Sequence, residues 1–183
     1  MDNVDPDIII KARKELENVT PIKGDCGLLC GSLCCKKTEK SEQSEDFGMW
    51  LFPGEAQLYK NHANFKVVQA DGNSSYPFLL CGYSCEKNDF CKREERPLFC
   101  RFFPYFPVVD RNNGIEIIVH PTALKMCPLI TSKYKLRITS EFSRAVKKAV
   151  YIMLNDAELR EYLTETGEYL KSMSEFVQKI IGD

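Results

Sequence analysis

Apolar residues near the N-terminus recur at the spacing of an amphipathic helix. The pattern covers 9–19, with Asp5 placed to cap the first turn and Pro6 at a position that tolerates proline. Thr20 and Pro21 end the pattern, because proline cannot continue a helix. The sequence therefore predicts an N-terminal helix with one buried face.

The C-terminal part of the chain has a longer helical pattern. From Ser140 onward, apolar residues repeat with helical period. Asn155, three residues before Glu158, predicts the cap of a second helix, and the same spacing at Ser172 predicts a third that ends at Gly182. The apolar positions of the first of these helices are Phe142, Ala145, Val146, Ala149, Val150 and Met153.

Strand-like segments lie between these two helical regions. The segments 65–70, 105–109 and 115–120 are short, rich in β-branched and aromatic residues, and bounded by turn residues. The turn at 111–114 makes the last two a hairpin, whereas the prolines and aromatics of 101–109 indicate extended, irregular chain. We expect the three segments to form one small antiparallel sheet.

Strands and helices that are separated along the chain are typical of an α+β fold. We expect a single domain over 1–183, with an N-terminal helix and a helical layer at 139–182. Between them, 26–128 is a cysteine-rich region with irregular metal-binding segments.

Composition narrows the classes of function. Apolar residues make up 44% of the chain and charged residues 28%, as in soluble globular proteins. The 25 basic and 26 acidic residues leave a net charge of -1, which provides no general attraction to nucleic acid or anionic lipid. No apolar run approaches the roughly 20 residues of a membrane span, and no signal-peptide core is present. We expect a cytoplasmic protein with neither nucleic acid nor membrane as partner.

Nine cysteines are the most unusual feature of the sequence. Cytosolic thiols are kept reduced, and an odd number cannot pair completely, so a disulfide framework is disfavoured. Thiolates are ligands for zinc and for iron–sulfur clusters, including the [4Fe–4S] type. The cysteines are Cys26, Cys30, Cys34 and Cys35 in a first block, Cys81, Cys85, Cys91 and Cys100 in a second, and Cys127.

The cysteine spacing indicates a metal without selecting one. Residues four apart share a helix face, so Cys26 and Cys30 can hold one centre. Neither the paired C-x2-C of zinc ribbons nor the run of a bacterial ferredoxin is present. We expect the two blocks to meet around one or two centres, closed by Cys127. His120 is an alternative ligand or a structural residue, and His62 is expected to be exposed on a helix.

The segment CKREERPLFCRFFP (91–104), with CGLLCGSLCC before it and Cys127-Pro128 after it, resembles the YkgJ-like cysteine-cluster family, described as a zinc- or iron-chelating domain. The resemblance covers roughly 26–128, and the first spacings here are x3 where the family has x2. It implies metal ligands at Cys26, Cys30, Cys34, Cys35, Cys81, Cys91, Cys100 and Cys127, with Cys85 as the alternative to Cys81.

Arg96 and Arg101 flank Cys100 in the most specific part of this motif. A thiolate cluster carries negative charge, so nearby guanidinium groups would lower its cost and donate hydrogen bonds to sulfur. The alternative is that both arginines form surface ion pairs with the neighbouring Glu94 and Glu95.

Three functions follow from these features. The first is a protein that holds zinc or an iron–sulfur cluster in a structural or redox role. The second is an enzyme that depends on its cluster, as the resemblance to flagellin lysine methylases implies, although no nucleophile, base or nucleotide motif identifies catalytic residues. The third is a metal-stapled module whose C-terminal helices dock a protein partner.

Overall fold

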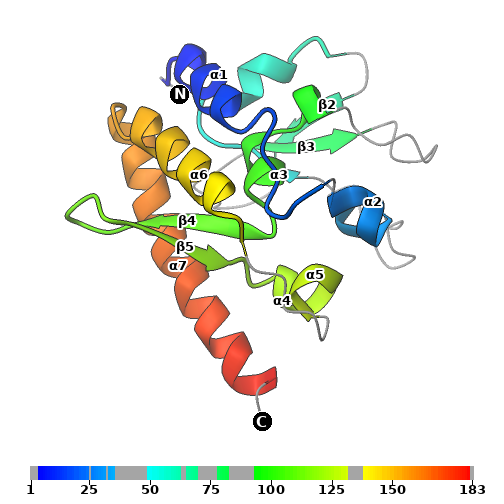
Figure 1. Ribbon diagram of the computed structural model, residues 1–183. Coiled ribbons are helices and arrows are strands. Elements are labelled where there is room, and N and C mark those ends of the chain that lie inside the picture. The colour runs from blue at the N-terminus through cyan, green and yellow to red at the C-terminus, as the bar shows by residue number, and fades with distance from the viewer. Residues whose placement is uncertain are drawn as a thin grey trace.

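The computed structural model describes residues 4–24, 26–31, 33–35, 49–62, 65–69, 78–82, 93–131 and 138–181. It confirms an α+β fold. Helix α1 packs along α6, and α7 crosses the sheet formed by β4 and β5 (Figure 1). The elements of this body are α1 (Pro6–Glu15), α3 (Leu98–Phe102), β4 (Tyr105–Val109), β5 (Ile115–Val119), α6 (Ser140–Met153) and α7 (Ala157–Ile181).

The predicted N-terminal helix is confirmed. The Asp5 carboxylate accepts a hydrogen bond from the Asp7 backbone N–H at 2.9 Å, and Pro6 occupies the first helical position. Ile9 and Ala12 have no exposed surface, so the apolar stripe faces the core as its spacing predicts.

The predicted hairpin is also confirmed. β4 and β5 pair antiparallel, from Tyr105 opposite Val119 to Val109 opposite Ile115. The Asp110 carboxylate holds this turn, because it accepts hydrogen bonds from the backbone N–H groups of Asn112 and Gly114 at 2.7 and 2.8 Å.

The expectation of one three-segment sheet is wrong. The strand at 65–70 belongs to a separate antiparallel sheet of order β1-β3-β2 and does not join β4 and β5. Its partner β3 follows it closely in sequence, so this pairing closes a much shorter loop than one with β4 would. The strands are β1 (Met49–Trp50), β2 (Phe65–Gln69) and β3 (Phe78–Gly82).

The segment 101–109, which its prolines and aromatics predict to be extended, is extended only from Tyr105 onward. Its first two residues belong to α3, which begins after Pro97, where the Leu98 backbone N–H donates to the Glu55 carboxylate at 2.8 Å. Phe103 and Pro104 form a turn, and the chain then enters β4. The aromatic rings pack around Phe52, which lies against the rings of Phe99, Phe102, Phe106 and Tyr162.

The C-terminal region contains one long helix where two short ones were predicted. Asp156, not Asn155, caps α7, because its carboxylate accepts from the Leu159 N–H at 3.0 Å. The Ser172 hydroxyl donates to the Glu168 carbonyl within the helix instead of capping a new one. Within the described ranges, neither α7 nor another helix is long and apolar enough to cross a membrane.

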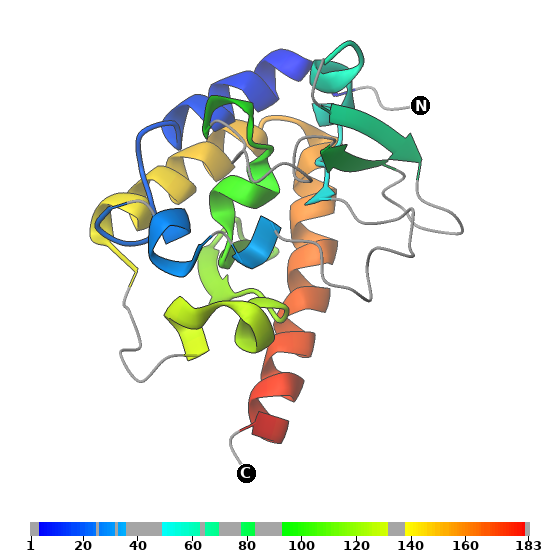
Figure 2. The same cartoon turned by 90° about the vertical axis from the view of Figure 1, so that its right-hand side faces the viewer.

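Short helices connect these elements and carry several of the cysteines. α2 lies above α4 and α5 in both views (Figures 1 and 2). They are α2 (Cys26–Cys30), η1 (Leu33–Cys35), η2 (Glu55–Tyr59), η4 (Arg93–Glu95), α4 (Ala123–Met126) and α5 (Pro128–Thr131).

Candidate metal centre

The first cysteine block is helical where its spacing predicts a shared face. Cys26 and Cys30 stand at the two ends of α2, one helical turn apart. Both side chains are partly buried, as is that of Cys34 in η1. Gly31 between these helices has a φ of 61°, a conformation that glycine adopts without strain and that lets the chain turn sharply after Cys30.

Cys127 lies at the junction of α4 and α5, immediately before Pro128. The backbone N–H groups of Leu129 and Ile130, at the start of α5, lower the pKa of its thiol, and the Ile130 N–H donates to the Cys127 backbone carbonyl at 2.9 Å. Burial outweighs this effect, so the net shift of the Cys127 pKa is upward. The protein alone therefore favours the neutral thiol, although two nearby backbone N–H groups reduce the cost of a thiolate.

The structure brings these two segments together. α2 packs against α5, and Cys26 packs on a small buried cluster that contains Ile22, Ala123, Cys127 and Leu129. Cys30 is close enough that its charge raises the pKa of Cys127. Cys30 and Cys127 carry free thiols. Three of the predicted ligands, Cys26, Cys30 and Cys127, therefore lie near one another although about 100 residues separate them in the sequence.

Cys100 lies on α3, with a partly buried side chain. Its charge raises the pKa of the Tyr59 hydroxyl, in addition to the larger effect of burial. The α3 end of the chain also reaches the Cys127 cluster, because Phe103, the residue that follows α3, packs against it. Cys100 is thus held on α3 by the main core, and the structure places only Phe103, three residues later, against the Cys127 cluster.

The remaining predicted ligands lie beyond what the structure describes. For Cys35 and Cys81 only the backbone is placed, in η1 and β3, and Cys85 and Cys91 are outside the described residues. Among the side chains that are described, no three from histidine, cysteine, aspartate or glutamate form a group that could hold a metal ion. The geometry therefore supplies pairs of thiols, and a complete ligand set stays a prediction.

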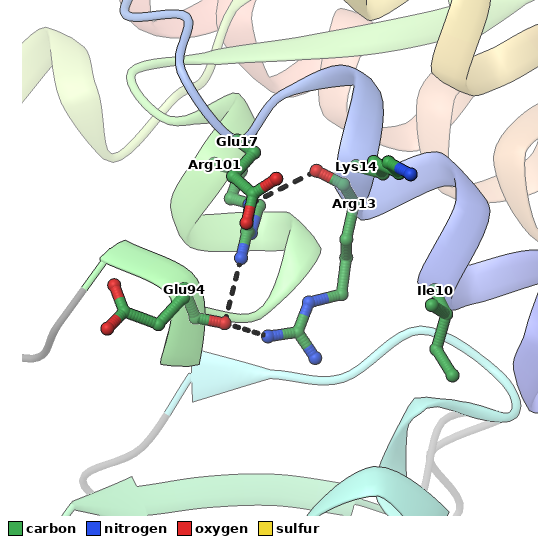
Figure 3. Close-up of a pocket in the computed structure, with 6 residues that line it drawn as sticks. All are labelled: Ile10, Arg13, Lys14, Glu17, Glu94 and Arg101. Atoms are coloured by element: carbon green, nitrogen blue, oxygen red, sulfur yellow. Dashed lines mark hydrogen bonds between the residues drawn. The ribbon is translucent and has the colours of Figure 1, made fainter.

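Arg101 occupies a position different from the surface ion pair considered for it. Its side chain is buried, and it donates to the backbone carbonyls of Arg13, Glu94 and Arg96 at 3.1, 3.0 and 2.8 Å (Figure 3). It thereby ties α1 to η4 and α3. Arg96 serves as one of these carbonyl acceptors, and its backbone N–H donates to the Arg93 carbonyl.

A further arginine strengthens the same connection. Arg93 follows the second cysteine block in sequence, and its guanidinium donates to the backbone carbonyls of Leu16, Glu17 and Val19 at the end of α1. Cations at a helix C-terminus satisfy its last carbonyls and complement its dipole. The chain leading into the first block is therefore fixed beside the chain that follows Cys91, independently of any metal.

Sequence reasoning missed the buried carboxylate of Glu55. The side chain has no exposed surface and accepts from the backbone N–H groups of Phe52 and Leu98 at 3.1 and 2.8 Å. Burial raises the pKa of Glu55 to about 7, although both hydrogen bonds and the charges of Arg13 and Arg101 lower it. A glutamate after Pro-Gly has no sequence signal that distinguishes it from an exposed residue.

The two histidines have structural surroundings. His120 Nδ1 accepts from the Thr122 backbone N–H at 3.2 Å, and its ring packs against Phe99, Phe103 and Phe106. Burial lowers the pKa of His120 to about 4, so the ring is neutral at pH 7. His62 follows η2 and is about one quarter exposed, less than its predicted exposure, with Glu95 at 3.9 Å.

Comparison of the chain with protein-family models, with curated proteins and with solved structures finds no match.

Proposed function

We propose that this protein binds zinc or an iron–sulfur cluster through cysteine thiolates, in a structural or redox role. Cys127 carries the proposal, because it is a buried thiol that lies near two further cysteines, Cys26 and Cys30, and whose pKa is lowered by neighbouring backbone N–H groups against the effect of burial. Hydrogen bonds to sulfur are a general feature of metal-bound thiolates, since they stabilise the charge and orient the ligand.

The chemistry of these donors fits a soft metal. A buried thiolate needs a compensating cation, which a bound metal supplies. Zinc would cross-link distant segments, whereas a cluster would add one-electron transfer. We assign Cys26, Cys30 and Cys127 to the centre, with Cys34, Cys35, Cys81, Cys91 and Cys100 completing one or two four-ligand sets, as the resemblance to the YkgJ-like family implies.

Purification without oxygen, followed by metal analysis and a visible spectrum, tests this function. We expect stoichiometric metal. A brown protein that absorbs at about 400 nm contains an iron–sulfur cluster, and a colourless protein with bound zinc contains a structural zinc site. Protein that retains neither zinc nor iron, while its circular dichroism shows the native helices, would contradict the proposal.

The exposed surface of α7 favours a second function, docking of a protein partner. Four large apolar side chains repeat at intervals of four, three and four residues, which places them on one helix face. Contiguous exposed apolar surface of this kind is typical of interaction sites. The residues and their exposed fractions are Tyr169 64%, Met173 37%, Phe176 58% and Ile180 62%.

The charges beside this stripe indicate the chemistry of the partner. The α-helical rotation of 100° per residue places four carboxylates against one ammonium group on the solvent side of the stripe, so this border is acidic on balance. The residues are Glu161, Glu165, Glu168, Glu175 and Lys179. Pairing with a second copy would bring two acidic flanks together, which is unfavourable. We infer that the occupant is an amphipathic helix with basic flanks, which matches both the apolar stripe and its acidic border.

A synthetic amphipathic peptide of leucine and lysine provides the test. It should bind the full chain and shift the amide resonances of residues 169–180, and Phe176→Ser should weaken binding by at least about tenfold. Tyr151→Ser, which removes an equally exposed aromatic ring from α6, is the control. Equal binding of a leucine and glutamate peptide would exclude the basic partner, and a dimer that dissociates in Phe176→Ser would identify a second copy instead.

A further inference from the structure

A pocket of about 320 Å³ lies between α1 and the segment that joins η4 to α3 (Figure 3). This volume is at the small end of ligand cavities, so the pocket suits a compact ligand. Its position is distinct from Cys127, and none of the predicted metal ligands lines it. The lining residues are Ile10, Arg13, Lys14, Glu17, Glu94 and Arg101.

Two guanidinium groups meet at the wall of this pocket. Arg13 Nη2 and Arg101 Nη2 both donate to the Glu94 carbonyl oxygen, at 2.7 and 3.0 Å (Figure 3). Arg101 is almost completely buried, and its pKa is lowered to about 10 by burial and by the neighbouring charges of Arg13 and Arg93. Like charges held this close favour the binding of an anion between or beside them.

The cations of the pocket are not neutralised by an ion pair within the described part of the chain. Arg13 and Arg101 donate to carbonyl oxygens, and no carboxylate lies within ion-pair distance of either. The rim carboxylates of Glu17 and Glu94 are exposed, and Figure 3 shows that of Glu94 turned away from Arg13. The nearby Glu55 is buried under the network and is partly protonated at pH 7.

Arg13 is oriented before any ligand arrives. Its guanidinium carbon lies 5.5 Å from the centre of the Tyr59 ring, and its Nη2 is held by the Glu94 carbonyl. A guanidinium presents five N–H donors in a fixed plane, so its Nε and Nη1 remain to contact a ligand in the pocket. Pre-oriented donors of this geometry are suited to two oxygens of one oxyanion.

We propose that this pocket binds a phosphate group, with Arg13 and Lys14 contacting the phosphate oxygens and the buried charge of Arg101 behind them. Three cations around one small cavity favour a dianionic ligand over a monoanionic carboxylate. Lys14 also lines the pocket, and its exposed, flexible side chain would turn toward a bound phosphate to supply a second contact from α1. Ile10 provides the apolar part of the wall.

Inorganic phosphate, titrated at pH 7 into the full chain as purified, tests this site. Calorimetry should show saturable binding that Arg13→Gln weakens by at least about tenfold, because a charge-assisted pair of hydrogen bonds is lost. Lys14→Gln should weaken binding several-fold, and Glu94→Gln should strengthen it. Acetate should bind more weakly than phosphate.

The matched control is Arg111→Gln, which removes the same charge at the tip of the β4–β5 hairpin and should leave the affinity within about twofold. Circular dichroism checks that each variant is folded. If Arg13→Gln does not fold, the exposed positions Lys14 and Glu94 decide the result. Absence of saturable phosphate binding, equal losses in the Arg13 and Arg111 variants, or acetate binding as tight as phosphate would overturn the proposal.

Discussion

Serine in place of Cys127 should leave the purified protein without stoichiometric metal. The Cys127 thiol is the predicted ligand that the structure supports best, because it is buried and both Cys26 and Cys30 lie close by. Serine is nearly isosteric but is a poor ligand for a soft metal. We expect the same loss for Cys30→Ser and Cys100→Ser, and also for Cys34→Ser and Cys91→Ser, measured by metal analysis of protein purified without oxygen.

Cys85→Ser is the matched control for these variants and should have the mildest effect, since Cys85 is the alternative to Cys81 in the predicted ligand set. Circular dichroism of every variant separates loss of metal from loss of fold. Full metal content in Cys127→Ser would remove this residue from the centre. Full content in Cys100→Ser would overturn the assignment that rests on the Arg-Pro motif.

Metal removal should destabilise the cysteine segments more than the main core. A metal that joins Cys30 to Cys127 closes a loop of roughly 100 residues, which chain-entropy arguments value at about 5 kcal/mol. From the sequence alone we expect metal removal to destabilise the whole of 26–104. The structure restricts the expected destabilisation to 26–35 and the α4–α5 region, because Leu98 and Phe102 of α3 are fully buried in the main core. Hydrogen exchange before and after chelation shows which of these two ranges loses protection.

Glu55→Gln should remove about 3 kcal/mol of pH dependence from the free energy of unfolding. The folded-state pKa of Glu55 is about 7, above its ordinary 4.5, so the native state binds more protons between these values. The contribution of Glu55 is therefore most favourable below pH 4.5 and is lost as the pH rises to 7. Glutamine carries no charge, so its contribution stays constant over this range.

Urea unfolding of both proteins from pH 4.5 to 8 measures this effect as a difference between the two curves. The difference is needed because His120 acts in the opposite direction: burial lowers its pKa to about 4, so its contribution grows as the pH rises to 6.5. Glu165→Gln, at an exposed position in the middle of α7, should change stability by less than about 0.5 kcal/mol. Parallel curves for wild type and Glu55→Gln would show that Glu55 keeps one protonation state throughout.

Local sequence signals predicted the elements whose stability is decided by neighbouring residues. The cap at Asp5 and the turn at 111–114 were predicted correctly because their hydrogen bonds join residues two to four apart. The cap predicted at Asn155 missed by one residue, because the adjacent Asp156 supplies the capping carboxylate. The cap predicted at Ser172 failed because α7 continues through Gly167, where the helix lies in close contact with Val108, so packing on the sheet outweighs the local pattern.

From the sequence alone, the α+β fold, the N-terminal helix and the hairpin could be predicted, while a soft metal at the cysteine blocks stays a prediction. Three features appear only in the folded structure: Cys127 lies with Cys26 and Cys30, β2 belongs to a second sheet, and Glu55 and Arg101 are buried. Helix periodicity, caps and turns depend on residues a few positions apart. Burial and electrostatic proximity instead depend on segments up to about 100 residues apart, and spacing along the chain carries no record of those contacts.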